Sequence, residues 1–188
     1  MTWPDLPTAP RGAEEPLQPP SSPRRASAAF AAAIAAVAAD QLTKTQAFAY
    51  VAYNGDLELN PFLGITAGTN SGIAFGLATA LHPLLLVGIA VAICVWILIL
   101  IRASHGLLRQ AALGTILGGA LGNIIDRARL GAVRDIIDLH WEGWHWPTFN
   151  LADAFILTGL LLLVFLPDPA RSEIGDTPGS ATAAEPGK

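Results

Sequence analysis

The stretch QAALGTILGGALGNII, residues 110–125, decides the fold because it is both apolar and rich in glycine. Gly114, Gly118 and Gly122 recur every four residues. Glycines at this spacing line one face of a helix and allow the backbone of a neighbouring helix to approach closely. The stretch therefore predicts a tightly packed helical bundle, in which polar groups at membrane depth are sheltered from lipid.

The composition favours a polytopic membrane protein. Of the 188 residues, 52% are hydrophobic and 14% are charged, whereas an average soluble domain carries about 25% charged residues. The mean hydropathy is +0.46. The net charge of −4 arises from scattered tail and loop residues rather than from a basic stripe, so nucleic-acid binding is not expected. The single cysteine, Cys94, provides neither a disulfide nor a CxxC motif.

Four apolar segments could span about 30 Å of hydrocarbon at about 1.5 Å per residue. The first is rich in alanine and resembles a cleavable signal peptide, but the polar tail before it favours a retained helix. The regions outside the spans, 1–25 and 168–188, lack an apolar period and are predicted to be disordered tails. The four segments are 26–49, 83–101, 110–125 and 149–166.

Basic residues near the helix ends predict that both termini are cytoplasmic. Arg24 and Arg25 precede the first segment, and further basic residues lie in the link 102–109. The two other connections, 50–82 and 126–148, are then extracytoplasmic. The first mixes apolar runs with turn formers, which predicts a small sheet at the membrane surface. The second contains three clustered tryptophans, which favour the headgroup layer.

Ionisable residues within the spans are informative, because each costs about 2.5–3.5 kcal/mol at a helix centre unless it is paired or sheltered. Asp40 and Lys44 are four residues apart on one helix face, so we expect them to pair. Asp126 and Arg127 are expected to pair with neighbouring elements, and Asn123 lies one turn earlier than Arg127 on the same face. Structural pairing accounts for all of these residues.

Asp135 and Asp153 differ because neither has an evident cation. Arg134 adjoins Asp135, but consecutive side chains point apart. Asp153 lies in the first turn of the fourth segment, where capping with Asn150 is one explanation for it. The other explanation is that both acids meet at the outer side of the bundle and share one proton.

Such a carboxylate pair supplies the groups that peptide hydrolysis requires. Its ionised member takes a proton from water, and its protonated member polarises the carbonyl and protonates the leaving amine. The sequence contains neither HExxH nor GxSxG, so we expect no metal and no cofactor.

Four motifs in order resemble those of the lipoprotein signal peptidase family, also called signal peptidase II. They are DQLTK (40–44), NSGIAF (70–75), GGALGNIIDRARLGAVRDIID (118–138) and FNLADAF (149–155). The resemblance covers residues 26–167 and implies a mainly α, inner-membrane aspartyl endopeptidase with four transmembrane helices and a small extracytoplasmic β-cradle. The family cleaves prolipoproteins on the N-terminal side of the diacylglyceryl-modified cysteine, and we expect this chain to work as a monomer.

The same resemblance makes Asp135 and Asp153 the catalytic pair. It implies positioning or supporting roles for Asn70, Asn123, Arg127, Asn150, Asp126, Asp40 and Lys44. The sequence departs from the family at Arg134, where an apolar residue is common, and in its long proline-rich N-terminal tail.

Two other classes remain open from the residues alone. A proton- or ion-coupled carrier also embeds carboxylates in its spans, but the chain lacks an evident internal repeat and a surface sheet has no role in a carrier. A scaffold that packs through its glycines leaves Asp135 and Asp153 unexplained.

Overall fold

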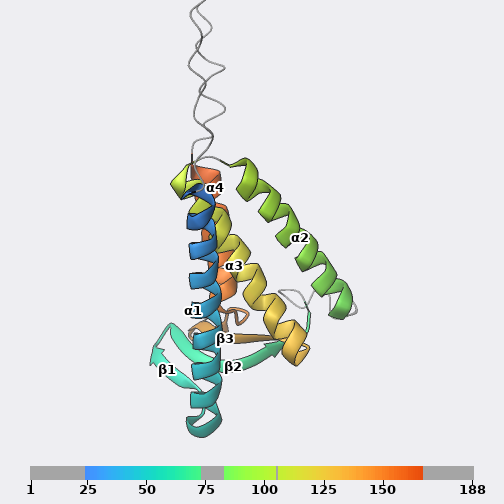
Figure 1. Cartoon of the computed structure of the whole chain (residues 1–188). Helices are drawn as coiled ribbons and strands as arrows, with labels where there is room; N and C mark the ends of the chain where they lie inside the picture. The colour runs from blue at the N-terminus through green and yellow to red at the C-terminus, as the bar shows by residue number, and fades with distance from the viewer. Residues whose placement is uncertain (1–23, 73–82, 105, 167–188) are drawn as a thin grey trace, which may run out of the picture.

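The computed structural model describes residues 24–72, 83–104 and 106–166. The described chain forms a helical bundle with a small sheet at one end (Figure 1). The predicted tails lie outside the described residues, except for Arg24 and Arg25 at the start of the first helix. The end of the first outer connection, 73–82, also lies outside them. The elements in chain order are α1 (Arg24–Asn54), β1 (Leu57–Asn60), β2 (Leu63–Asn70), α2 (Pro83–Ala103), α3 (Leu107–Leu130), β3 (Val133–Trp141), β4 (Trp144–His145) and α4 (Leu151–Phe165).

Helix α3 is the centre of the bundle and contacts each of the other three helices. Its glycines permit close packing, as predicted: a Cβ on Gly118 would lie 2.5 Å from the carbonyl oxygen of Ala33 on α1. A Cβ on Gly114 would meet the backbone of Ala29 on the same helix. The retained first helix is therefore an integral part of the bundle. Figure 1 shows α1 and α3 side by side, whereas α2 leans away from them toward the sheet end.

The helices α1 and α3 continue beyond their predicted ends. The prediction ended these helices at residues 49 and 125, where the apolar runs stop, but they end at Asn54 and Leu130. In the extra turn of α3, Asp126 pairs with Lys44 and Arg134, and Arg127 donates to the Gly72 carbonyl oxygen. In the extra turn of α1, Asn54 bonds the Tyr50 carbonyl oxygen of its own helix. Helix α3 then stops at Gly131, whose φ of 75° suits glycine and whose N–H bonds the Arg127 carbonyl.

The sheet draws on both outer connections, whereas the sequence predicted strands only in the first. Its order is β1-β2-β3-β4, with each neighbouring pair antiparallel. A bulge between Ile65 and Gly68 interrupts the pairing of β2 with β3. Ile137 of β3 also bridges to Phe149, just before α4 begins. The tryptophan-rich segment is thus part of the sheet and connects it to α4.

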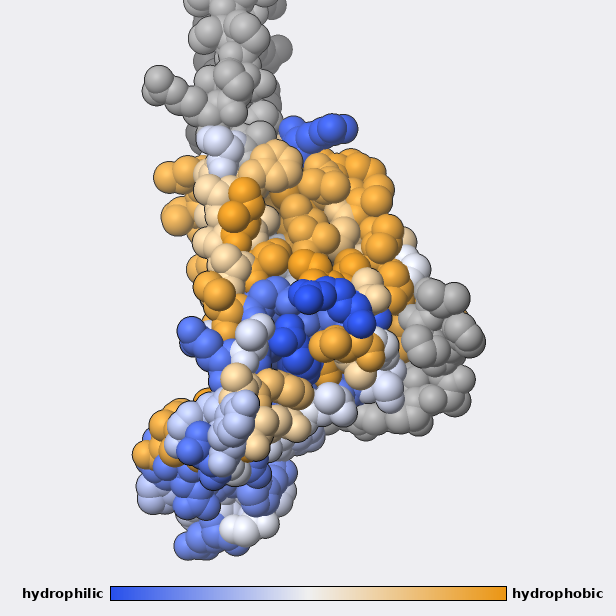
Figure 2. Space-filling view, turned by 60° about the horizontal axis from the view of Figure 1, so that its bottom comes forward, coloured by the Kyte–Doolittle hydropathy of each residue, from blue (hydrophilic) through white to orange (hydrophobic). Residues whose placement is uncertain are grey.

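Hydrophobic side chains cover the helical part of the face seen in Figure 2, and hydrophilic side chains gather where the helices meet the sheet. One described helix is long and apolar enough to cross a membrane by length and composition alone, at Leu85–Ala103 within α2, and α4 is a shorter apolar helix. The count of four transmembrane helices stays a prediction.

The close contact between α1 and α3 predicts a position-dependent response to an added methyl group. Gly118→Ala should lower the free energy of unfolding by about 1–3 kcal/mol, because its Cβ would crowd Ala33 and Ala36. Gly88→Ala on α2 is the matched control, since a Cβ there meets nothing within 4 Å. Thermal unfolding in detergent should separate the two variants; equal melting temperatures would contradict the packing.

Candidate active site

A buried ion network connects α1 to α3. The ammonium group of Lys44 lies 2.8 Å from Asp40 Oδ2 and 3.1 Å from Asp126 Oδ2. All three residues are fully buried. The predicted pairing of Asp40 with Lys44 is therefore confirmed, and Asp126 is the neighbouring group that completes it.

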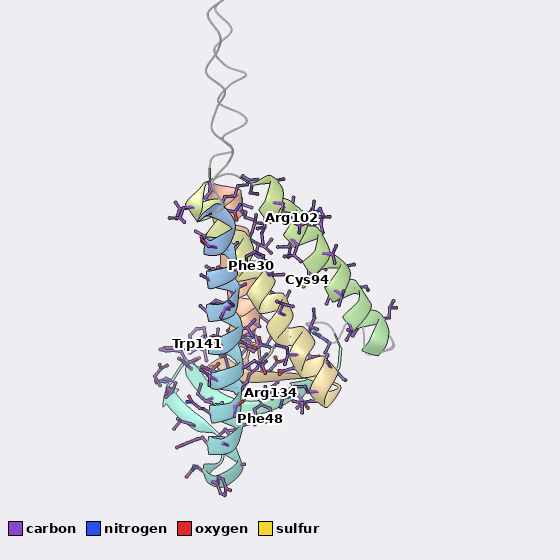
Figure 3. All side chains as sticks on the ribbon, viewed as in Figure 1. Phe30, Phe48, Cys94, Arg102, Arg134 and Trp141 are labelled. Carbon is purple, nitrogen blue, oxygen red and sulfur yellow. The ribbon has the colours of Figure 1, made fainter. Side chains whose placement is uncertain are left out.

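Arg134 extends this network from the sheet. Its Nη2 lies 2.8 Å from Asp126 Oδ1 and donates a hydrogen bond to Gln41 Oε1 at 3.0 Å. The guanidinium also lies over the Phe48 ring, 5.9 Å from its centroid, and Figure 3 shows both residues at the sheet end of α1. Arg134 thus points away from its neighbour Asp135, as side-chain alternation predicts. Its place in the network was not predicted, and nor was that of Gln41, which adjoins Asp40 in the sequence.

The same network holds the start of α4 in place. Asp40 Oδ1 accepts a hydrogen bond of 2.9 Å from the backbone N–H of Ala152. This acid of the first helix therefore binds one of the free N–H groups at the N-terminus of the last one. Gly122 makes room for the contact, because a Cβ there would lie 2.6 Å from Asp40 Oδ2.

Asp153 sits in the first turn of α4 and is held by two asparagines. Asn150 caps the helix: its Oδ1 accepts the Asp153 N–H at 3.0 Å, and its own N–H reaches Asp153 Oδ2 at 3.4 Å. Asn123 donates from Nδ2 to Asp153 Oδ1 at 2.8 Å. Lys44 donates to Asn123 Oδ1 at 3.2 Å, which fixes the orientation of that amide. These hydrogen bonds fix the position of the Asp153 carboxyl group at the start of α4.

Asp135 is almost fully buried on β3 and faces the same asparagine. Asn150 Nδ2 donates to Asp135 Oδ1 at 2.7 Å, and the Asn70 side chain also hydrogen-bonds Asp135. Burial raises the pKa of Asp135 from 3.8 to about 6, and repulsion by the Asp153 charge adds to the rise. Asn150 thus contacts both acids, so the capping and dyad explanations for Asp153 hold together.

Both carboxyl groups line one pocket of about 790 Å³ between the sheet and the helix ends. Arg127 lies in its wall and donates to the Gly72 carbonyl oxygen at 3.0 Å, which holds the chain after β2 beside the pocket. The buried Arg127 Nε has no hydrogen-bond partner among the residues that the structure describes. The other lining residues are Gly68, Thr69, Asn70, Ser71, Asn123, Val133, Trp146, Pro147, Thr148, Phe149, Ile156, Leu157 and Leu160.

The structure divides the predicted site residues into two groups. One group is at the pocket: Asn150 bonds both acids, and five residues line the pocket, namely Asn70, Asn123, Arg127, Asp135 and Asp153. Asp40, Lys44 and Asp126 lie behind it in the ion network. Within the described part of the chain, no third histidine, cysteine or acid joins Asp135 and Asp153 as a metal-ligand group.

Comparisons with known proteins agree on one family. The family model described as signal peptidase (SPase) II matches residues 32–166. A lipoprotein signal peptidase of Burkholderia thailandensis is 44% identical over 133 residues, which cover 67% of this chain and 78% of the relative. One from Anaplasma phagocytophilum is 37% identical over 141 residues, covering 73% and 90%. A solved bacterial membrane enzyme, determined in meso at 2.3 Å resolution, has a TM-score of 0.63 and 27% identity, covering 85% of this chain and 95% of that chain.

The buried network predicts a large cost when its cation is lost. Lys44→Met should lower the free energy of unfolding by about 3–5 kcal/mol, because it leaves the Asp40 carboxylate buried without a counter-charge. Arg102→Met is the matched control, since it removes a cation from the exposed last turn of α2. Chemical unfolding of both variants in mixed micelles measures the difference, and a Lys44→Met loss as small as the control's would contradict the account.

Proposed function

The chain belongs to the signal peptidase II family, and we propose that Asp135 and Asp153 are the carboxyl groups with which it cleaves prolipoproteins. Removal of the signal peptide from prolipoproteins, by an aspartic peptidase, is the activity of this family and of this chain. Because the chain belongs to a peptidase family, the alternative functions of carrier and scaffold are set aside. The observation that carries the catalytic assignment is the hydrogen bonding of Asn150 to both acids at the wall of one pocket.

The surroundings of the two acids support different roles. Asp153 is assigned as the base, because it accepts hydrogen bonds from Asn123 and Asn150 at the wall of the pocket. Asp135 is the acid, because burial and the Asp153 charge raise its pKa to about 6. Two acids whose environments separate their proton affinities form a working acid–base pair.

The reaction follows from these roles. Asp153 takes a proton from water as the water oxygen attacks the scissile carbonyl carbon, and protonated Asp135 donates a hydrogen bond to the carbonyl oxygen. Asp135 then gives its proton to the leaving amine as the C–N bond breaks, and the proton that Asp153 took from water returns to Asp135, so the ionised and protonated carboxyl groups are restored. Arg127 lines the pocket, where its guanidinium can donate a hydrogen bond to a substrate carbonyl.

The pocket suits a lipid-modified peptide. Its polar end holds the two acids, and its other end runs along α4 past Ile156, Leu157 and Leu160. Leu157 and Leu160 are 58% and 48% exposed, so this wall is open toward lipid. The four residues Asp153, Ile156, Leu157 and Leu160 share one helix face. A diacylglyceryl chain along that face places the bond before the modified cysteine near the acids.

The membrane arrangement is part of the proposal. All four helices span a bacterial inner membrane as one peptidase domain, residues 26–167, with both tails cytoplasmic and the sheet extracytoplasmic. The 24 residues of α3 extend about 36 Å, enough to cross the hydrocarbon. The 15 residues of α4 extend about 22 Å, so its polar start lies close to the hydrocarbon boundary. The chain is proposed to act as a monomer, since one copy supplies both acids and the asparagine that bonds them.

Neutralising either acid should stop the reaction. We expect Asp135→Asn and Asp153→Asn each to lower the rate of prolipoprotein cleavage at least about a hundredfold, since general acid–base catalysis supplies about 10²–10⁴-fold. Gel shift of a diacylglyceryl-modified prolipoprotein measures conversion. Glu58→Gln, which neutralises an exposed acid on β1, is the matched control. Normal processing by either asparagine variant would refute the catalytic pair.

A further inference from the structure

A second group of ionisable side chains lies on the β3–β4 hairpin, away from the pocket. It consists of Asp138 and His140 on β3 and His145 on β4, and we call it the hairpin triad. One ligand atom from each residue lies within 4.8 Å of the others. None of the three lines the pocket with the catalytic acids.

The backbone register places the three side chains on one face. Asp138 and His140 are two residues apart on β3, so they point to the same side of the sheet. His145 pairs directly with His140 across the hairpin, and its side chain therefore lies beside that of His140. The triad lies farther along β3 than Asp135, outside the pocket that the catalytic pair lines.

Both imidazoles converge on one carboxylate. His140 Nδ1 lies 3.1 Å from Asp138 Oδ2, and His145 Nδ1 lies 2.9 Å from Asp138 Oδ1. The two rings are tilted, with centroids 5.3 Å apart. The neighbouring strand leaves room for them, because a Cβ on Gly64 would lie 3.4 Å from His140 Cε1.

This donor set suits a divalent transition metal. Zn²⁺ binds imidazole nitrogen and carboxylate oxygen at about 2.0–2.2 Å, so ligand atoms in a tetrahedral site lie about 3.3 Å apart. The Nδ1 atoms of His140 and His145 already lie 3.1 and 2.9 Å from the oxygens of Asp138, close to that spacing. Asp138 and His140 are largely buried, with 17% and 14% of their side chains exposed, whereas His145 is 59% exposed. The ion would therefore have fixed ligands on β3 and an open side toward water.

We propose that the hairpin triad binds one Zn²⁺ ion, with water in the remaining coordination positions. The ion is structural: it joins β4 to β3 in place of the two imidazole–carboxylate hydrogen bonds. The chain that follows β4 forms a wall of the pocket through Trp146, Pro147, Thr148 and Phe149. Zinc at the triad would therefore steady that wall without contacting the catalytic acids.

Zinc titration of the full, tag-free chain in detergent, stripped with EDTA, tests the proposal. Competition with a chromophoric chelator should show one Zn²⁺ bound per chain. Asp138→Asn and His145→Ala should each weaken binding at least about tenfold, because even changes outside the ligand set cost about 10–100-fold. Glu142→Gln removes an exposed acid from the same hairpin and should leave the affinity unchanged.

Two results would overturn the site. One is that the wild-type chain fails to bind one Zn²⁺ ion, or that His145→Ala binds Zn²⁺ as tightly as the wild-type chain does. The other is loss of binding in Asp153→Asn, which would place the ion in the pocket instead. Since Asp153→Asn should bind zinc normally while failing to cleave prolipoprotein, failure of the metal site and failure of the catalytic pair are distinguishable.

Discussion

The ammonium group of Lys44 is buried between Asp40 and Asp126, and the rest of the structure depends on this pairing. A fully buried charge is tolerated only with a partner, so the three residues fix the register of α1 against α3. Replacing a buried ion pair by apolar groups often leaves stability unchanged. The network is therefore better explained by the positions it specifies than by the stability it contributes.

Those positions lead directly to the site. Asp40 binds the start of α4 through the Ala152 N–H, and Lys44 orients Asn123, which in turn binds Asp153. One acid of the proposed pair is thus set by contacts that begin on the first helix. The other acid comes from the sheet, and Asn150 connects the two. Asn150 caps α4 and also binds the Asp135 carboxylate on β3, so both acids are held in place before the substrate binds.

Much of this arrangement could be predicted from the sequence. The glycine spacing of α3 predicted close packing with a neighbouring helix, and the interval from Asp40 to Lys44 predicted their pairing, because both depend on local helical geometry. The strands at 133–145 were missed, since their sheet partner is β2, which precedes them by more than sixty residues. Sequence alternation correctly turned Arg134 away from Asp135, but its pairing with Asp126 requires the turn at Gly131. The hairpin triad likewise depends on cross-strand register.

Asp135 and Asp153 are proposed to work as an acid–base pair in which the charge of Asp153 helps to keep a proton on Asp135. The most direct measurement is the pH titration of the Asp135 carboxyl carbon by NMR, in the full chain labelled at the aspartate side chains. The account predicts that the pKa of Asp135 lies near 6 and falls in Asp153→Asn, because the repelling charge is gone while burial remains. A pKa near the ordinary 3.8, or one that does not respond to Asp153→Asn, would contradict it.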